Sequence, residues 1–437
     1  MAKGEQQDAR QAALQALNAV DSGSHADRAL HRALAGVADA RDRGLASEIT
    51  YGVLRNRLRL DAEITPRLRG KTNPALLNLL RIGLYQLRFL ERVPAYAAVN
   101  SIVTLTKKEG FAYASSMVNA VLRRLERDGP PALPAGDDVA SLALRFSHPE
   151  WLVRGWIDQL GLDDAKKLLE ADQQQAGHSL RIRRGDAAQA VLALQSMGLV
   201  AARGQFVANA VRAEGGNPQE WPALQAGDWV LQDEAAQAMA ALLPPAKEHL
   251  DLCAAPGGKA FLLADRDAAA VLAIDSEPSR LDDLRAFASK LGLAQRIEAR
   301  LADARTFDAG RRFASVLVDA PCSGLGTLRR NPDRKWKPAP PAELPRLQGD
   351  ILRQAARQVA PGGHLLYVTC TVWAPENEGV VAAFESAHRS WQRARREHPF
   401  ASGDGLYRSR PDLHGTDAFF AALWQAPAGD TETVSGR

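Results

Sequence analysis

The sequence predicts an α/β protein in which an all-helical domain and a small mixed α/β module precede a Rossmann-like, doubly wound domain. Three observations predict this organisation. The chain has 437 residues, more than one hydrophobic core usually organises. Its amino-terminal part places apolar residues at helical spacing. From His249 onward, short apolar segments alternate with helical patterns, as in a parallel sheet covered by helices on both faces.

The first predicted domain spans residues 1–130 and is helical. Apolar residues recur at helical spacing from Arg10 to about Arg127. Pro74 and Pro94 divide this stretch into several helices, because proline fixes its own backbone and disfavours a helical residue before it. The segment GPPALPAG, residues 129–136, contains three prolines and two glycines and is therefore predicted to be a linker.

The second predicted domain, residues 137–220, is a small mixed α/β module. It opens with HPEWLVRGWIDQLG from His148, which gives a helix one apolar face. The segment SLRIR around Leu180 alternates like a strand. Asp186 to Met197 is predicted to be a helix, and Gly204 to Val211 contains a second possible strand.

The third predicted domain, residues 225–427, is the doubly wound one. A helix is predicted in VLQDEAAQAMAALL, which begins at Val230. The predicted strands that follow are HLDLC, AVLAID, a strand before Asp303, ASVLVDA and HLLYVTC. The polar tail after Pro427 is expected to fray.

Composition and charge are those of an ordinary globular protein. Hydrophobic residues make up 46% and charged residues 24%, and the formal net charge is +4. The basic residues nevertheless cluster in runs, which suit a polyanionic partner or, equally, a solvated helix face. The runs are Arg55, Arg57, Arg59; Arg123, Arg124, Arg127; and Arg329, Arg330, Arg334, Lys335, Lys337.

Features that the sequence lacks limit the expected location, metal content and oligomeric state of the protein. No apolar stretch approaches the roughly 20 residues that span a bilayer, and the start MAKGEQQDAR has no signal-peptide core. We therefore expect a cytoplasmic protein without a membrane partner. The three cysteines are too few and too widely spaced for a disulfide framework or a zinc site, so reduced thiols and no metal are expected. A monomer is expected because no long exposed apolar stripe is evident.

A ligand crevice is predicted where the first strand of the sheet meets the next helix. Asp251 to Lys259 reads DLCAAPGGK, in which small residues let a ligand approach the backbone. The following helix presents free N–H groups to an anion, and Lys259 adds a cation. By itself this loop is weak evidence, because a structural turn can have the same composition and the spacing is not that of a Walker sequence.

Acids at successive strand ends strengthen the prediction of a cofactor site. Asp275 follows AVLAI and is placed like an acid that bonds ribose hydroxyls. Asp303, in LADAR, is expected to accept from an adenine amino group, and Asp319 ends VLVD. One such acid is most often a helix cap, but three at one crevice edge favour a ligand. The candidate cofactor-binding residues are Cys253, Ala254, Ala255, Pro256, Gly257, Gly258, Lys259, Asp275, Asp303 and Asp319.

Two cysteines end two different predicted strands. Cys322 lies in DAPCSG and Cys370 in TCT, so both thiols are expected at the same edge of the sheet, where they can share one pocket. A free cysteine met without context is usually a small buried hydrophobe.

These motifs, taken in order, resemble those of the NOL1/NOP2/Sun RNA cytosine-C5 methyltransferase family. The resemblance rests on Asp251–Lys259, Asp319–Gly324 and Thr369–Thr371, and it covers roughly Val230 to Trp424. The amino-terminal region resembles a NusB-like RNA-binding domain. Together with HPEWLVRGWIDQLG, it points to the bacterial branch that modifies small-subunit (16S) ribosomal RNA.

The resemblance implies S-adenosylmethionine as cofactor and a division of labour between the thiols. Carbon 5 of cytosine is a poor nucleophile, so its methylation needs prior covalent attack on carbon 6 by a thiolate. Cys370 is then the nucleophile, and Cys322 helps to remove the proton from carbon 5. Asp319 would hold the N3 and amino edge of the base. Lys259 would reach the cofactor carboxylate or active-site groups.

The resemblance also implies an RNA substrate whose target base leaves its stack. The NusB-like helices and the basic run Arg329, Arg330, Arg334, Lys335 and Lys337 would supply phosphate contacts. The sequence does not identify the cytosine, and it leaves open whether naked RNA or a partly assembled subunit is the substrate. Two departures from the family pattern, Thr371 for serine and Ala418 for glycine, leave the thiols untouched.

Three other functions are consistent with parts of the sequence. A methyltransferase acting on an exocyclic nitrogen would need no nucleophile, but its usual Asp/Asn-Pro-Pro-Tyr motif is replaced here by Asp319-Ala320-Pro321-Cys322. A catalytically idle RNA-binding scaffold would not bind the cofactor, and the intact cysteines argue against it. A thiol oxidoreductase is the weakest alternative, because no two cysteines are close in sequence.

Overall fold

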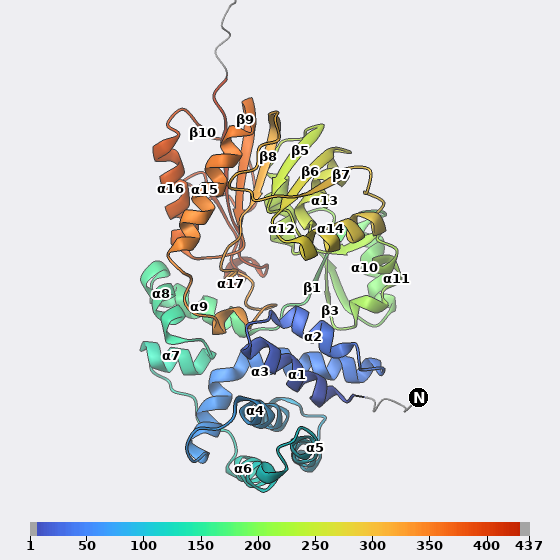
Figure 1. The fold of residues 1–437 in the computed structure, drawn as a ribbon, viewed down its shortest axis with the longest axis vertical. Coiled ribbons are helices and arrows are strands. Elements are labelled where there is room, and N and C mark those ends of the chain that lie inside the picture. Colours follow the sequence, from blue (N-terminus) through green and yellow to red (C-terminus); the bar gives the residue numbers. More distant parts are fainter. Residues whose placement is uncertain (1–6, 429–437) are drawn as a thin grey trace, which may run out of the picture. The chain divides into compact units, whose positions relative to one another are not determined.

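The computed structural model describes residues 7–428, which form two compact units (Figure 1). The first unit comprises residues 7–175 together with Leu328–Ala339. The second comprises Ala176–Thr327 and the residues from Pro340 onward. The predicted frayed tail falls mostly outside the described residues. None of the described helices is both long and apolar enough to cross a bilayer.

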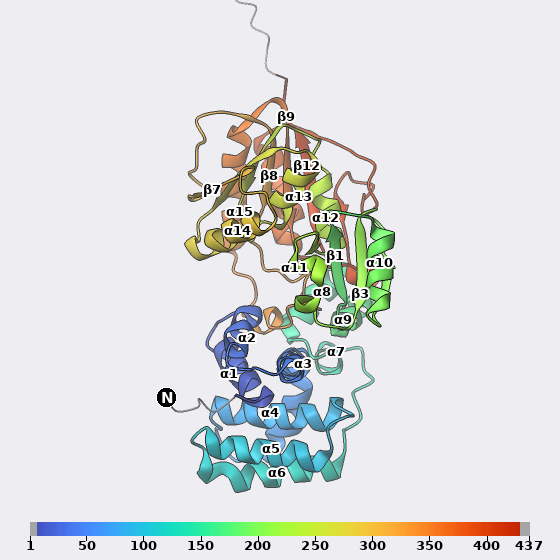
Figure 2. The same ribbon diagram turned by 90° about the vertical axis from the view of Figure 1, so that its right-hand side faces the viewer.

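The first unit is helical, as predicted. Helices α4, α5 and α6 pack against one another (Figure 2). Asn73 caps α4 through its side chain, and Pro74 occupies the first helical turn, where its missing N–H removes no hydrogen bond. The helices are α1 (Ala9–Asp21), α2 (Ala26–Leu34), α3 (Ala40–Ile64), α4 (Pro74–Phe89), α5 (Ala95–Lys108), α6 (Ser115–Asp128), α7 (Val139–Phe146), α8 (Glu150–Leu160) and α9 (Leu162–Gln173).

Residues 137–175 belong to this helical unit, although the sequence analysis grouped them with the middle module. Helix α7 packs on α3. The Leu58 backbone N–H donates to the Ser147 hydroxyl at 3.0 Å, and Arg59 donates to the Arg145 carbonyl. The proline-rich segment before α7 lacks regular secondary structure. The apolar faces of α7–α9 are therefore buried against helices, and the sheet begins only after Gln175.

The second unit begins with a small antiparallel sheet. Its order is β2-β3-β1-β4. The predicted strand at SLRIR and the predicted helix after it are confirmed as β1 and α10. The second predicted strand is wrong over residues 204–209, which form a turn whose Phe206 and Val207 N–H groups donate to the Glu234 carboxylate. The elements are β1 (His178–Ile182), α10 (Ala187–Ser196), β2 (Val200–Arg203), β3 (Ala210–Glu214), α11 (Pro222–Gln225) and β4 (Trp229–Leu231).

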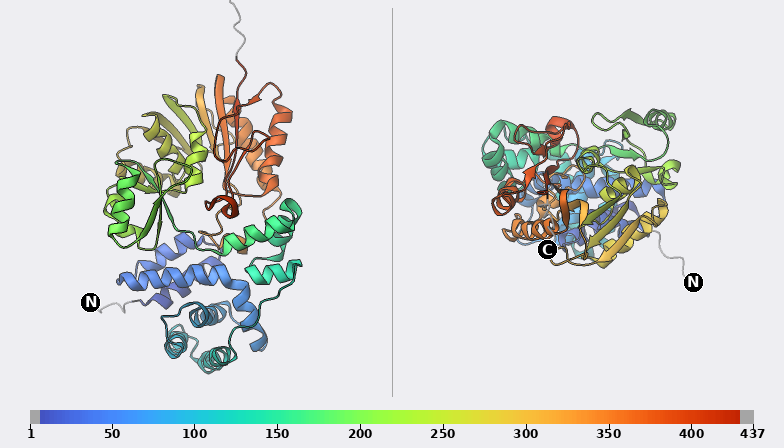
Figure 3. Two further views of the ribbon diagram at one scale, coloured as in Figure 1. Left: turned by 180° about the vertical axis from the view of Figure 1, so that it is seen from behind. Right: turned by 90° about the horizontal axis from the view of Figure 1, so that it is seen from above.

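The large sheet has the predicted doubly wound character. Its order is β10-β12-β9-β8-β5-β6-β7, with β5 to β9 parallel and β12 antiparallel to β9. Helices α12–α14 cover one face, and α15 and α16 cover the other (Figure 3). The elements are α12 (Glu234–Ala241), β5 (Glu248–Leu252), α13 (Gly258–Arg266), β6 (Ala270–Asp275), α14 (Pro278–Lys290), β7 (Ile297–Leu301), β8 (Phe313–Asp319), α15 (Glu343–Arg357), β9 (Val359–Thr369), α16 (Glu378–Ala387), β10 (Gln392–Arg393), β11 (Tyr407–Arg408), α17 (Pro411–His414) and β12 (Phe420–Gln425).

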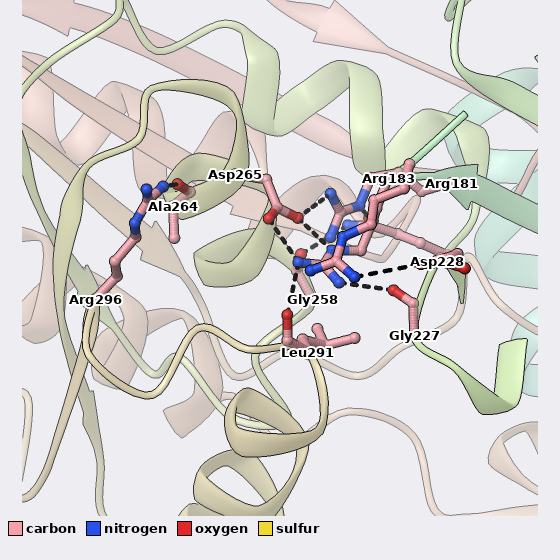
Figure 4. A network of polar contacts seen from close by, with 11 residues as sticks. Arg181, Arg183, Gly227, Asp228, Gly258, Ala264, Asp265, Leu291 and Arg296 are labelled. Atoms are coloured by element: carbon pink, nitrogen blue, oxygen red, sulfur yellow. Dashed lines mark hydrogen bonds and ion pairs between the residues drawn. The ribbon is translucent and has the colours of Figure 1, made fainter. Parts of the chain in front are cut away.

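A charged cluster links the small sheet to the large one (Figure 4). Asp265 at the end of α13 accepts hydrogen bonds from Arg181 at 2.7 Å and from Arg183 at 2.7 and 2.8 Å. Arg183 also donates to the carbonyls of Gly227 and Leu291. Both arginine side chains are buried, so their charges depend on this one carboxylate.

We predict that Asp265→Ala lowers the free energy of unfolding by about 3 kcal/mol, because it leaves two buried guanidinium groups without their counter-charge. Urea unfolding followed by tryptophan fluorescence measures the loss. Asp282→Ala is the matched control: it removes an exposed partner of Arg285, and we expect less than about 0.5 kcal/mol. Equal effects of the two substitutions would show that the cluster contributes little.

Candidate active site

The candidate site lies at the carboxyl ends of four parallel strands. The strand order reverses at β5, whose neighbours are β6 on one side and β8 on the other. The connections that leave β5 and β8 therefore run to opposite faces of the sheet and leave a crevice between them. The predicted cofactor loop follows β5, and the two cysteine loops follow β8 and β9.

The loop after β5 is a tight turn held by backbone hydrogen bonds. The Ala254 N–H donates to the Ile274 carbonyl at 2.9 Å, and the Gly257 N–H donates to the Ala254 carbonyl at 2.8 Å. Gly257 has φ +105°, and a Cβ there would lie 2.3 Å from the Phe261 ring. Only glycine meets both conditions, so this residue is required by the turn as well as by any ligand.

Asp275 at the end of β6 is fixed against this loop. One carboxylate oxygen accepts from the Ala255 N–H at 3.1 Å, and the other accepts from the Glu277 N–H at 3.0 Å. Asp303, beyond the end of β7, is more exposed and pairs with Arg305, which lowers the pKa of its carboxyl group through hydrogen bonding. Asp275 and Asp303 thus follow the adjacent strands β6 and β7, but of these two acids Asp275 alone bonds to the loop.

Lys259 connects the cofactor loop to the motif that follows β8. Its ammonium donates to Asp319 at 2.8 Å and lies 5.1 Å from the centre of the Phe419 ring. Burial acts to lower the pKa of Lys259, but the charge and hydrogen bond of Asp319 outweigh it, and the pKa is raised. Lys259 is therefore a charged group directed at Asp319, and Asp319 is partly open to solvent.

Asp251 is a buried acid to which the sequence analysis assigned no role. Neither carboxylate oxygen has a hydrogen-bond partner among the described residues. Burial, followed by the negative charge of Asp319, raises its pKa well above the usual range. Burial and the nearby charge of Asp319 thus favour the neutral form of this carboxyl group in strand β5.

The two predicted thiols lie side by side. The Cys322 and Cys370 Sγ atoms are 3.3 Å apart, beyond the roughly 2.05 Å of a disulfide bond, so the two thiols are not joined by a disulfide. The Cys370 N–H also donates to the Cys322 Sγ at 3.4 Å. The hydrogen bond to Cys370, together with burial, raises the pKa of Cys322 well above its usual value. The two sulfur atoms are therefore close enough to share a hydrogen bond in which either can be the donor.

Close backbone packing brings the thiol loops together. The Gly326 N–H donates to the Cys370 carbonyl at 3.0 Å, and the Gly326 carbonyl accepts from the Ala418 N–H at 2.8 Å. A Cβ at Gly326 would lie 2.3 Å from the Ala418 oxygen. The hydroxyls of Ser323 and Thr371 are 2.8 Å apart, so threonine at 371 keeps the bonding group of serine.

The sequence analysis missed three buried polar residues behind these loops, namely Gln348, Glu376 and Asn377. A polar run, Pro375-Glu376-Asn377-Glu378, follows the TCT motif, but the sequence does not show what these residues bond to and gives no sign of Gln348.

The structure corrects one predicted RNA contact in the basic run. Lys335 is 1% exposed, and its ammonium donates to the Arg55 carbonyl at 3.0 Å inside the helical unit. Burial lowers its pKa well below the usual range. Trp336 beside it donates to the Leu54 carbonyl at 2.6 Å, and Arg55 donates to the Arg329 carbonyl. Lys335 thus anchors this segment and is not presented to a phosphate.

Comparisons with known proteins cover each part of the chain. The sequence model of the 16S rRNA methyltransferase RsmB/F family matches residues 239–425. The NusB family model matches residues 7–127, and the RsmF/B-like ferredoxin-like domain matches residues 148–219.

Relatives match over most of their length. A probable ribosomal RNA small subunit methyltransferase B of Bacillus subtilis is 35% identical over 402 residues, covering 87% of this chain and 89% of that protein. Ribosomal RNA small subunit methyltransferase B of Xylella fastidiosa is 35% identical over 418 residues, covering 92% and 96%. In fold, the chain is similar to the crystal structure of PH0851, with a TM-score of 0.83, 24% identity and coverage of 95% and 98%.

A second similar fold is that of NSun6 from Pyrococcus horikoshii with SFG. Its TM-score is 0.58 at 18% identity, and the match covers 64% of this chain and 99% of that one.

We predict that alkylation of Cys322 by iodoacetamide is slow in the native protein and still accelerates above pH 9. The thiolate is the reactive form, and a raised pKa shifts its appearance to higher pH than in a free cysteine. Peptide mass spectrometry after short pulses from pH 7 to 10 measures the rate, with urea-unfolded protein as the reference. Native and unfolded rates that coincide at pH 7 would contradict the assignment.

Proposed function

Because the chain belongs to the 16S rRNA methyltransferase RsmB/F family, we propose that it methylates carbon 5 of a cytosine in small-subunit ribosomal RNA through a covalent cysteine–C6 adduct. Methylation of ribosomal RNA with S-adenosylmethionine follows from the family. The choice of carbon 5 and the covalent route rest chiefly on one observation: two thiols that form no disulfide lie 3.3 Å apart, on the loops that follow β8 and β9.

The crevice residues suit S-adenosylmethionine, which supplies a methyl group on a positively charged sulfur. The loop from Cys253 to Gly258 would accommodate it. Asp275 retains lone pairs for ribose hydroxyls, and Asp303 would accept from the adenine amino group. The unpartnered carboxyl of Asp251 is a buried polar group that a bound polar ligand would satisfy.

The first step falls to Cys370. Its thiolate forms the S–C6 bond, and the electron pair of the C5–C6 double bond becomes available at carbon 5 for the methyl group. Asp319 would hold the N3 and amino edge of the cytosine, and Lys259 fixes that carboxyl group through the 2.8 Å hydrogen bond. The Lys259–Asp319 ion pair would therefore position the base against Cys370.

The second step falls to Cys322, and the first step prepares it. Before attack, the hydrogen bond and the charge of Cys370 help to raise the pKa of Cys322 and keep its proton in place. Bond formation to C6 consumes that charge, so the pKa of Cys322 falls and its thiol can give up its proton to a water molecule. The Cys322 thiolate then takes the proton from carbon 5, the C5–C6 double bond re-forms, and the thiolate of Cys370 leaves.

RNA binding is proposed for the NusB-like helices, the small sheet module and the remaining basic residues of the run after β8. Arg330, Arg334 and Lys337 are partly exposed, and Arg329 is mostly buried. The partly exposed Arg330, Arg334 and Lys337 would contact phosphates through their positive charge, without reading sequence. The substrate is small-subunit ribosomal RNA, either naked or partly assembled.

We predict opposite behaviour of the two cysteine variants in gel analysis of protein bound covalently to small-subunit ribosomal RNA with cofactor present. Cys322→Ala accumulates a stable adduct, because the proton on carbon 5 is not removed. Cys370→Ala gives neither adduct nor methylated RNA. If Cys370→Ala still methylates, the covalent route is wrong, and methylation of the exocyclic nitrogen or reversed thiol roles must be considered.

A further inference from the structure

The loop that contains Cys322 is held on both sides by a buried pair of side chains. The Glu376 Oε2 atom accepts from the Ser323 N–H and from the Gln348 side-chain amide, both at 2.9 Å. The same Gln348 amide donates to the Pro321 carbonyl at 2.9 Å. The residues before and after Cys322 are therefore both bonded to the Glu376–Gln348 pair.

The loop that contains Cys370 is held in the same manner by the next residue. The Asn377 side-chain amide donates to the Thr371 carbonyl at 2.9 Å, and its oxygen accepts from the Thr369 hydroxyl at 2.6 Å. The residues before and after Cys370 are thus both bonded to Asn377. Two consecutive residues, Glu376 and Asn377, each hold the neighbours of a different thiol.

Burying these polar side chains costs desolvation free energy that apolar side chains in the same place would not cost. Glu376 and Gln348 are 0% exposed, and Asn377 is 3% exposed. The second oxygen of Glu376, Oε1, has no hydrogen-bond partner among the described residues. A carboxylate buried in this way is disfavoured unless its bonds serve a purpose, and apolar residues would fill the same space more favourably.

The backbone of the same turn is also fixed. The Tyr367 hydroxyl donates to the Glu376 carbonyl at 2.7 Å, and Tyr367 lies inside strand β9. The turn Ala374–Glu376 is thereby attached to the strand that leads to Cys370. The side chains at 376 and 377 start from a fixed base, so the positions of both thiol loops follow from them.

We propose that Glu376 and Asn377 are positioning residues, each of which orients one of the two thiols. Glu376, with Gln348, sets Cys322 for removal of the carbon 5 proton, and Asn377 sets Cys370 for attack on carbon 6. This inference rests on the proposed function, because it assigns each residue to one of its two steps. Neither residue contacts the substrate; each acts through the loop that it holds.

The two residues should therefore fail at different steps. Loss of the Glu376 carboxylate frees the Cys322 loop while Cys370 remains in place, so attack proceeds and release is slow. Loss of the Asn377 amide frees the Cys370 loop, so the S–C6 bond forms slowly and no adduct accumulates. A displacement of about 1 Å at a reacting atom lowers a rate by about 100-fold.

The test compares Glu376→Ala and Asn377→Ala in single-turnover reactions on small-subunit ribosomal RNA, following the covalent adduct and the methylated product separately. We expect Glu376→Ala to slow release by about 100-fold with accumulation of adduct, and Asn377→Ala to slow adduct formation by a similar factor. Glu376→Gln retains an oxygen that can accept from Ser323 and should restore most of the release rate. Asn377→Asp retains the acceptor for Thr369 but loses the donor to Thr371, so it should resemble Asn377→Ala.

Three controls separate the possible failures. Glu378→Ala, which removes an exposed partner of Arg408 at the start of α16, should behave as wild type. Cys322→Ala and Cys370→Ala run in parallel; if Cys370→Ala methylates, the proposed function itself fails. If the cysteine variants behave as expected but Glu376→Ala and Asn377→Ala slow both steps equally, or neither, the positioning inference is overturned. Should Asn377→Ala fail to fold, Asn377→Asp, which is expected to behave in the same way, replaces it. Should Glu376→Ala fail to fold, Gln348→Ala, which removes the amide bonded to the Pro321 carbonyl, replaces it and should slow release alone.

Discussion

Parallel pairing of β8 with β9 is the constraint on which the rest of the site depends. The register places Asp319 opposite Val368, and the Ala320 N–H extends the ladder to the Val368 carbonyl at 2.9 Å. Both strands therefore end at the same level, and the two cysteine loops leave side by side. A slip of one residue would move every side chain of a strand to the other face and would separate the thiols. The strand order of the sheet therefore brings the two thiols together, and side-chain contacts then adjust their positions.

Electrostatic interactions and burial then favour one protonation state for each of three buried groups, Lys259, Asp251 and Cys322. Lys259 remains charged because Asp319 faces it, while burial and the charge of Asp319 keep Asp251 neutral. Cys322 keeps its proton partly because Cys370 is its neighbour. The chemistry proposed here uses that coupling: the bond that consumes the charge on Cys370 also releases the proton of Cys322. Two ordinary thiols can in this way perform successive and opposite tasks in one pocket.

Much of this organisation could be predicted from the sequence, because it is encoded locally. Apolar segments of strand length predicted β5, β6, β8 and β9, and the carboxyl-end rule placed Asp275, Asp319 and the cysteines at one edge. The roles of Glu376 and Gln348 could not be predicted, because their bonding partners lie far away in sequence and only the fold brings them together. The burial of Lys335 was hidden for the same reason, since a basic run looks identical whether its side chains meet solvent or the carbonyls of a distant helix. The grouping of α7–α9 with the helical unit could not be predicted either. Hydrophobic periodicity shows that a helix has an apolar face, but it does not show which other element that face packs against.

The most direct test of the account is the identity of the modified nucleoside. Small-subunit ribosomal RNA that lacks the modification is incubated with the purified protein and S-adenosylmethionine, digested to nucleosides and analysed by chromatography with mass spectrometry against authentic standards. The account predicts 5-methylcytidine, with the methyl group on the base carbon and the proton of carbon 5 lost. N4-methylcytidine, or a methyl group on another base nitrogen or on a ribose oxygen, would contradict it, because those products need neither Cys370 as a nucleophile nor Cys322 as a base.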